Sequence, residues 1–159
     1  MPVLEGSCHC RAVTFRVASH TPTPYMRCYC SICRKTQGGG GYAINLMGEA
    51  ASLKVTGKKH LTVYQAMIDA AQSPAKRHFC KRCGSALWLF DPRWPDLVHP
   101  FASAIDSGLP AAPATEHIML DFKPAWVEVA AEDGANRHFR AYPEQSIEGW
   151  HESRGLWID

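Results

Sequence analysis

Seven cysteines in three clusters constrain this chain more than any other feature. The first cluster is a pair with one residue between its members, the second places three cysteines within six residues, and the third is a pair with two residues between its members. Such short spacings allow several thiolates to converge on one ion. Because the number is odd, disulfides alone cannot use every thiol. In chain order the residues are Cys8 and Cys10, then Cys28, Cys30 and Cys33, then Cys80 and Cys83.

The seven thiols divide naturally into four and three. Four thiolates complete a tetrahedral structural zinc site, whereas three leave one position open for chemistry. The third cluster, Cys80-x-x-Cys83-Gly84, is a zinc-knuckle pattern that supplies two ligands, and the first cluster is a ready second pair. We therefore predict two zinc ions. The closed site would be formed by Cys8, Cys10, Cys80 and Cys83, and the open site by Cys28, Cys30 and Cys33.

Two other interpretations of the clusters are open. Cys80-x-x-Cys83 could be a redox pair of the thioredoxin type, although no βαβ pattern surrounds it. The second cluster could be a further structural site that takes its fourth ligand from one of the eight histidines.

The formal charge of the open site indicates its chemistry. Three thiolates on a divalent zinc ion leave a net charge of −1, which weakens the Lewis acidity needed to make hydroxide. Such a site is better suited to hold a fourth thiolate, delivered by a substrate, in a form that stays deprotonated yet nucleophilic. Arg27, Arg34 and Lys35 are candidates to compensate the added charge. The loop Gly38–Gly41 could let backbone N–H groups approach a ligand, or could be only a mobile turn.

Length, composition and charge bound the possible function. The chain has 159 residues, and we expect a single domain over residues 1–159. Hydrophobic residues make up 46% and charged residues 20%, as in ordinary globular proteins, so a core can form without metal. The formal net charge of +2 is too small to indicate binding to nucleic acid or to an anionic membrane.

The chain lacks the sequence patterns of targeting and membrane insertion. The N-terminal residues have neither the basic start nor the apolar run of a signal peptide. No stretch approaches the roughly 20 apolar residues that cross a bilayer. We therefore expect a cytoplasmic protein, in which thiols stay reduced and clustered cysteines are more often metal ligands or redox groups than disulfides.

Short strand-like runs, separated by turn residues, predict a mainly β fold, and Ala12–Val17 alternates with Val13, Phe15 and Val17 on one face. Gly57-Lys58-Lys59 resembles a hairpin turn, and Pro100 indicates that its strand lies at a sheet edge. The one predicted helix is short and lies near the end, at Ser146–Gly155. The predicted strands are Ala12–Val17, Tyr42–Met47, Leu53–Thr56, Leu61–Gln65, Lys76–Phe79, Ala86–Phe90, Leu97–Ala102, Glu116–Leu120, Trp126–Ala130 and His138–Ala141.

The cysteine clusters, in this order, resemble those of the glutathione-dependent formaldehyde-activating enzyme family. The resemblance implies a small zinc-bound β fold, described as a β-tent, with a structural zinc at the four-cysteine set and a catalytic zinc at the three-cysteine set. It also implies that glutathione is joined to formaldehyde, or that the reverse carbon–sulfur cleavage occurs. The matching segments are Gly6-Ser7-Cys8-His9-Cys10, Cys28-x-Cys30-x-x-Cys33-Arg34, Phe79-Cys80-x-x-Cys83-Gly84-Ser85, Glu116-His117-Ile118 and Lys123-Pro124-Ala125-Trp126.

We therefore expect a zinc-dependent carbon–sulfur lyase or synthase that acts on a small thiol such as glutathione and an aldehyde such as formaldehyde. The sequence names no general acid or base. The alternative is a zinc-stabilised protein-binding module in which both metals are structural. A zinc nucleobase deaminase is disfavoured because Phe79 precedes Cys80 where that pattern has proline, and no His-x-Glu occurs. The short basic pairs Lys58-Lys59 and Lys81-Arg82 do not form the stripe of a nucleic-acid-binding protein.

Overall fold

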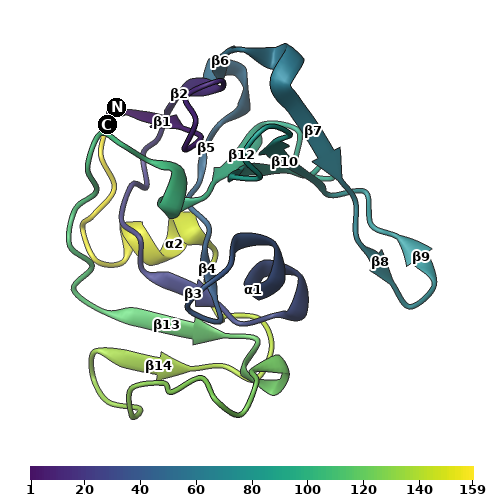
Figure 1. Cartoon of the computed structure of the whole chain (residues 1–159). Coiled ribbons are helices and arrows are strands. Elements are labelled where there is room, and N and C mark those ends of the chain that lie inside the picture. The colour runs from purple at the N-terminus through teal and green to yellow at the C-terminus, as the bar shows by residue number, and fades with distance from the viewer.

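Short strands make up most of the structure, which is mainly β with one short helix near the C-terminus, as predicted (Figure 1). The computed structural model describes residues 1–159. The strands form three sheets and one separate hairpin. No helix is both long and apolar enough to cross a membrane.

The first sheet carries the first cysteine pair in the turn between its first two strands. Its order is β1-β2-β6, all antiparallel, with five paired positions between β1 and β2. Alternate residues of β2, Phe15 and Val17, are buried against the second sheet, as the period of two predicts. The bounds are β1 (Val3–Ser7), β2 (Thr14–Ala18) and β6 (Lys54–Thr56).

The second sheet carries the third cysteine cluster between two neighbouring strands. Its order is β5-β12-β11-β10-β7, all antiparallel. Phe15 of the first sheet meets Trp88 of this sheet edge to face, with ring centroids 5.2 Å apart, so the two sheets share one core. The bounds are β5 (Gly48–Glu49), β7 (Leu61–Tyr64), β10 (Lys76–Cys80), β11 (Ala86–Phe90) and β12 (Leu97–Pro100).

The third sheet positions the second cysteine cluster. Its order is β14-β13-β3-β4, with β13 parallel to both β14 and β3. A second core lies here, in which Trp150 stacks on Tyr25 with ring centroids 3.7 Å apart. The bounds are β3 (Met26–Cys28), β4 (Ala43–Ile44), β13 (Thr115–Ile118) and β14 (Asn136–His138), with helices α1 (Ser31–Gln37) and α2 (Ile147–Glu152).

The remaining elements are short. The hairpin β8–β9 projects from the body of the molecule (Figure 1) and exposes Met67 and Ile68. Four single-turn 3₁₀ helices connect the strands. The bounds are β8 (Met67–Ile68), β9 (Ala71–Gln72), η1 (Ala50–Ser52), η2 (Lys58–His60), η3 (Ala102–Ala104) and η4 (Leu120–Phe122).

Three local predictions are wrong. Gly57–Lys59 is not a hairpin turn, because β6 pairs with β2 and β7 pairs with β10, in different sheets. Trp126–Ala130 is not a strand: the Lys123 ammonium donates to the Val127 carbonyl at 2.6 Å and closes this segment into a loop. Pro100 lies in β12, between β5 and β11, but β5 ends its pairing at Val98, so no partner needs the missing N–H of Pro100.

Other predicted elements are present with shifted limits. Within the predicted strand Tyr42–Met47, the structure has β4, and isolated β-bridges follow at Asn45 and Met47. The C-terminal helix is shorter than predicted and begins after Ser146, whose hydroxyl caps it by accepting from the Gly149 N–H at 3.0 Å. Helix α1 and the strands β1, β3, β5, β8 and β9 were not predicted from the sequence.

Candidate metal centres

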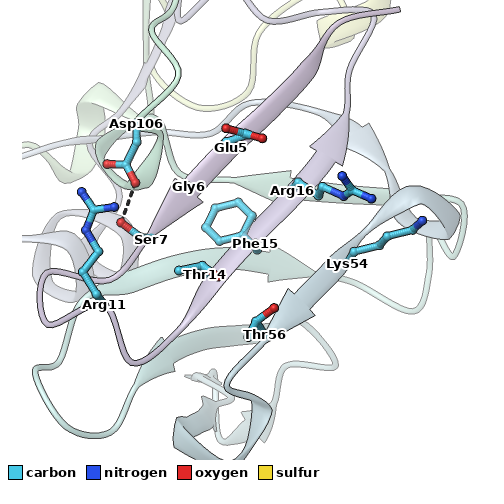
Figure 2. A pocket seen from close by; sticks show the side chains of 10 residues that line it. All are labelled: Glu5, Gly6, Ser7, Arg11, Thr14, Phe15, Arg16, Lys54, Thr56 and Asp106. Atoms are coloured by element: carbon cyan, nitrogen blue, oxygen red, sulfur yellow. Dashed lines mark hydrogen bonds between the residues drawn. The ribbon is translucent and has the colours of Figure 1, made fainter.

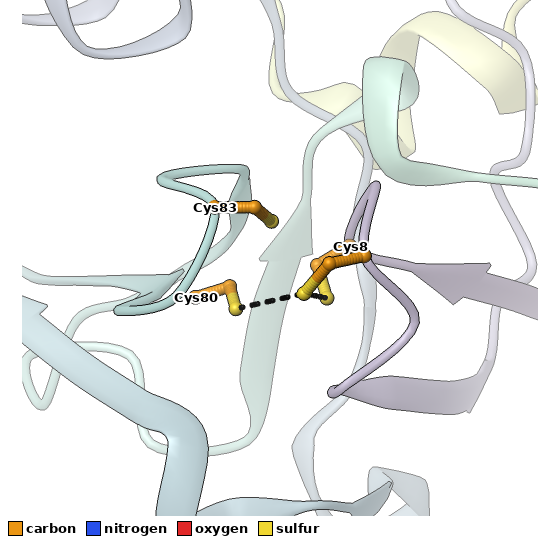
Figure 3. A group of neighbouring side chains, drawn as sticks. Cys8, Cys80 and Cys83 are labelled. Atoms are coloured by element: carbon orange, nitrogen blue, oxygen red, sulfur yellow. Dashed lines mark hydrogen bonds between the residues drawn. The ribbon is translucent and has the colours of Figure 1, made fainter.

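Four cysteines from two distant turns meet at one point, which we call the four-cysteine site. Cys8 and Cys10 lie in the turn from β1 to β2. Cys80 is the last residue of β10 and Cys83 lies in the turn from β10 to β11, and Figure 3 shows both beside Cys8. Their four sulfur atoms lie within 4.8 Å of one another. Cys10 Sγ lies 3.6 Å from Cys8 Sγ and 3.8 Å from Cys80 Sγ. A tetrahedron of sulfurs at about 2.3 Å from a zinc ion has edges of about 3.8 Å, so the site could hold such an ion.

Backbone hydrogen bonds shape the second of these turns. The Gly84 N–H donates to the Cys80 carbonyl at 2.7 Å, and Gly84 has a φ of +76°, a conformation that glycine adopts without strain. Ser85 then links the two turns, because its hydroxyl accepts from the His9 N–H at 3.0 Å and lies 3.2 Å from Cys83 Sγ. This contact lowers the pKa of the exposed Cys83 thiol to about 5, which favours the thiolate that a metal binds.

Cys28, Cys30 and Cys33 form a second group, the three-cysteine site. Cys28 is the last residue of β3, Cys30 caps the N-terminus of α1, and Cys33 lies in the first turn of that helix. The three sulfurs lie within 4.8 Å of one another, and the Cys33 N–H donates to Cys30 Sγ at 3.3 Å. No histidine or carboxylate atom joins this group. The structure therefore gives no support to a histidine as the fourth ligand beside the three cysteines. The group could hold a metal ion with one coordination position open.

The three thiols of this site differ in pKa because they hydrogen-bond to one another. Hydrogen bonds from Cys28 and Cys33 lower the pKa of Cys30 to about 2, and the same contacts raise the pKa of Cys28 far above its ordinary range. One thiol of the group therefore ionises readily and its neighbours keep their protons. A bound cation would supply the positive charge that all three thiolates need.

Arg77 contacts this site, and the sequence alone did not indicate it. Both terminal nitrogens of its guanidinium donate to Cys33 Sγ at 3.7 Å, and the Asn45 amide approaches the same sulfur at 4.0 Å. None of the predicted compensating residues donates a side-chain hydrogen bond to a cysteine sulfur. Arg27 lies over the Tyr42 ring at 4.7 Å, while Lys35 is exposed. The one available signal was that Arg77 precedes Cys80 by three residues in a predicted strand.

A buried polar chain lies next to the three-cysteine site. The Tyr29 hydroxyl lies 2.8 Å from His117 Nδ1, and His117 Nε2 lies 3.1 Å from Asn136 Oδ1. The Asn136 amide nitrogen donates to Asp133 at 3.2 Å, which directs the amide oxygen toward His117. His117 therefore carries its proton on Nε2 and accepts from Tyr29 through Nδ1. Tyr29 lies between Cys28 and Cys30 in the chain.

Cavities lie beside the cysteines as well as apart from them. A polar cavity of about 420 Å³ is lined by residues of both the Cys8 turn and the end of α1, among them Cys8, Ser85 and Gln37. A different cavity, of about 340 Å³, lies over the first sheet and contains no cysteine (Figure 2). There Arg16 and Lys54 lie on neighbouring strands, and the Ser7 hydroxyl donates to Asp106.

All seven cysteines are free of disulfides. Comparison with known proteins identifies the family of the chain. The model of the glutathione-dependent formaldehyde-activating enzyme family matches residues 3–121, a range that contains all seven cysteines.

The chain resembles two individual proteins along most of its length. A curated protein of Halomonas elongata, named "Putative glutathione-dependent formaldehyde-activating enzyme", is 62% identical over 154 residues, which cover 97% of this chain and 98% of the relative. The crystal structure of a Rhodobacter sphaeroides protein aligns with a TM-score of 0.54 and 29% identity over 67% of this chain and 91% of that chain. The chain belongs to the glutathione-dependent formaldehyde-activating enzyme family.

Proposed function

We propose that the chain binds two zinc ions and catalyses the formation or cleavage of a carbon–sulfur bond between a small thiol, glutathione or a close analogue, and formaldehyde or a similar aldehyde. One observation carries the proposal: three sulfurs converge at Cys28, Cys30 and Cys33, and no fourth protein ligand joins them. Family membership supports the choice of thiol and aldehyde.

The donor atoms fit zinc. Both groups consist only of thiol sulfurs, which are soft ligands that favour zinc over magnesium, calcium or manganese. The sulfur separations of 3.6 and 3.8 Å in the four-cysteine site are compatible with tetrahedral coordination. When bound in the three-cysteine site, zinc would keep a substrate sulfur deprotonated and nucleophilic at neutral pH.

The residues of the chain hold the reacting sulfur and limit its charge. Cys28, Cys30 and Cys33 would supply three of four ligands, so an incoming thiol would take the open position. Arg77 donates to Cys33 and brings one positive charge to a group that gains negative charge when the thiol binds. The four-cysteine site joins the β1–β2 turn to β10, the strand that carries Arg77, and so fixes the position of that charge.

The reaction is balanced without a further reactant. The thiol sulfur forms a bond to the carbonyl carbon, the π electron pair of the carbonyl moves to its oxygen, and that oxygen takes up the proton that the thiol has lost. The product is an S-hydroxymethyl adduct when the aldehyde is formaldehyde. In the reverse direction the carbon–sulfur bond breaks and the same proton returns to sulfur. Free thiols are required, and we place the reaction in a reducing compartment such as the cytoplasm.

The test measures exchange between free and adduct glutathione by NMR, with and without the zinc-loaded protein, at several formaldehyde concentrations. The proposal predicts an exchange rate that rises in proportion to protein concentration and falls to the protein-free rate in Cys30→Ser. Arg82→Gln, on the exposed β10–β11 turn, is the matched control and should exchange as fast as wild type. An exchange rate unchanged by the zinc-loaded protein would refute the proposal.

A coordination measurement separates this enzyme from a binding module with two structural metals. X-ray absorption at the zinc edge should give seven protein sulfurs for two zinc ions in the absence of thiol, and one additional sulfur after glutathione is added. If both zinc ions already have four protein ligands and glutathione changes nothing, the module is the correct interpretation.

A further inference from the structure

We propose that Arg77 is a positioning residue of the three-cysteine site, which orients Cys33 and offsets the negative charge that a substrate thiolate adds. The inference rests on the function proposed above. It concerns the same site and assigns a role to a residue of another sheet.

The contacts of Arg77 are directed at one atom. Both terminal nitrogens of its guanidinium lie 3.7 Å from Cys33 Sγ, and its side chain makes no other hydrogen bond. Arg77 also takes part in none of the five ion pairs of the molecule. Because Arg77 is half-buried and no carboxylate pairs with it, its guanidinium needs another acceptor inside the molecule. The sulfur of Cys33 is therefore the partner that this charge has.

The backbone of Arg77 is held rigidly. Arg77 lies in β10, inside its sheet, and pairs with Tyr64 of β7 on one side and with Leu89 of β11 on the other. Cys80 ends the same strand and belongs to the four-cysteine site. Because residues three apart on a strand point to opposite faces, Cys80 and Arg77 serve different sites from one strand. The metal that anchors Cys80 would thereby also fix the position of Arg77.

The charge of Arg77 matters most in the thiol-bound state. Zinc with three thiolates carries a formal charge of −1, and a fourth thiolate makes it −2. The guanidinium restores a net charge of −1 within one hydrogen-bonded group. Asn45, the other donor near Cys33 Sγ, lies at 4.0 Å and is neutral, so it cannot take over this role. Loss of such supporting partners lowers metal affinity or activity by about 10- to 100-fold in metal sites generally.

The experiment uses zinc-loaded full-length protein in three variants. Arg77→Gln keeps the ability to donate and removes the charge, Arg77→Lys keeps the charge, and Lys76→Gln removes an exposed charge from the neighbouring position. We expect Arg77→Gln to fold, to bind two zinc ions and to bind glutathione about 10- to 100-fold more weakly. The Kd should recover in part in Arg77→Lys and should equal that of wild type in Lys76→Gln. Glutathione binding by Arg77→Gln at wild-type strength would overturn the inference.

A second readout does not depend on glutathione. Competition with a coloured chelator measures how tightly the zinc of the three-cysteine site is held, and this zinc is identified by its loss in Cys30→Ser. We expect Arg77→Gln to release it at about 10-fold lower chelator concentration than wild type and Lys76→Gln. If wild type binds no glutathione, the proposed function fails, and the chelator comparison still decides the role of Arg77. Equal retention of zinc in all three proteins would then refute that role.

Discussion

The hydroxyl of Tyr29 lies 2.8 Å from Nδ1 of His117, and both side chains are buried. The partner of the other ring nitrogen, Asn136, fixes the proton on Nε2, so Tyr29 donates and His117 accepts. This hydrogen bond joins β13 to the residue between two cysteines of the three-cysteine site. It therefore ties the position of these cysteines to the third sheet.

Replacement of Tyr29 by phenylalanine should destabilise the fold. The change leaves His117 Nδ1 buried without a donor, and an unsatisfied buried polar atom costs about 1–3 kcal/mol. Urea unfolding of the zinc-loaded protein measures this loss as a lower transition midpoint at unchanged slope. Tyr42→Phe is the matched control, because Tyr42 is half-buried near Tyr29 and its hydroxyl makes no hydrogen bond. Equal losses in the two variants would contradict the assignment.

The same histidine should contribute to a loss of stability in mild acid. Burial lowers the pKa of His117, and the nearby Arg27 charge adds to that effect. The ordinary value, near about 6.5, applies in the unfolded chain. The unfolded state therefore binds the proton more readily, so this contribution is complete above about pH 6.5 and is lost as the pH falls through the lowered pKa of the folded state.

The pH effect is measured against a variant, because protonation of the cysteines also weakens metal binding in acid. The free energy of unfolding of wild type minus that of His117→Gln should decrease between pH 7.5 and pH 5.5. A difference that stays constant or increases as the pH falls would show that His117 is not held neutral.

Much of the architecture follows from local sequence patterns. The short apolar run Ala86–Phe90, which follows the third cysteine cluster, predicts β11 with correct bounds. The spacing of the cysteines predicts which residues could share an ion. Helix α1 is not predictable in this way, because a cysteine, Cys30, takes the place of the usual N-cap residues. The sequence pattern of Trp126–Ala130 suggests a strand. In the structure this segment has no partner strand, and Trp126 is 67% exposed.

The role of Arg77 is the clearest limit of sequence reasoning. Positive residues adjacent to the cysteines in sequence, such as Arg34 and Lys35, were natural candidates to balance the charge. The residue that contacts Cys33 comes from 44 positions further along the chain. Only the tertiary fold brings Arg77 of β10 to this sulfur, because the two residues belong to different elements.

Gly57 should be far less tolerant of substitution than another glycine of the same conformation. Its φ is +80°, and a Cβ atom would lie 1.8 Å from the Ala12 carbonyl oxygen, in the turn that carries Cys10. Gly108 has a φ of +81° and open space around it. We expect Gly108→Ala to lose about 1–2 kcal/mol from backbone strain alone, and Gly57→Ala to lose about 3 kcal/mol or more. Thermal unfolding of both variants tests this difference, and similar melting temperatures would contradict the close approach at Gly57.

The two metal centres should differ in what they contribute to stability. The four-cysteine site joins residues 70 positions apart, as the contact of Cys10 with Cys80 shows. A cross-link over a loop of that length stabilises a fold by about 4 kcal/mol, mainly by restricting the unfolded chain. The three-cysteine site closes only a short local loop.

Cys83→Ser should therefore lower the free energy of unfolding of the zinc-loaded protein by several times more than Cys30→Ser does, whereas only Cys30→Ser should abolish glutathione exchange. After exhaustive chelation the two variants and wild type should unfold with free energies within about 1 kcal/mol of one another, because the metal supplies the difference. A larger loss in Cys30→Ser than in Cys83→Ser would reverse the assignment of structural and reactive sites.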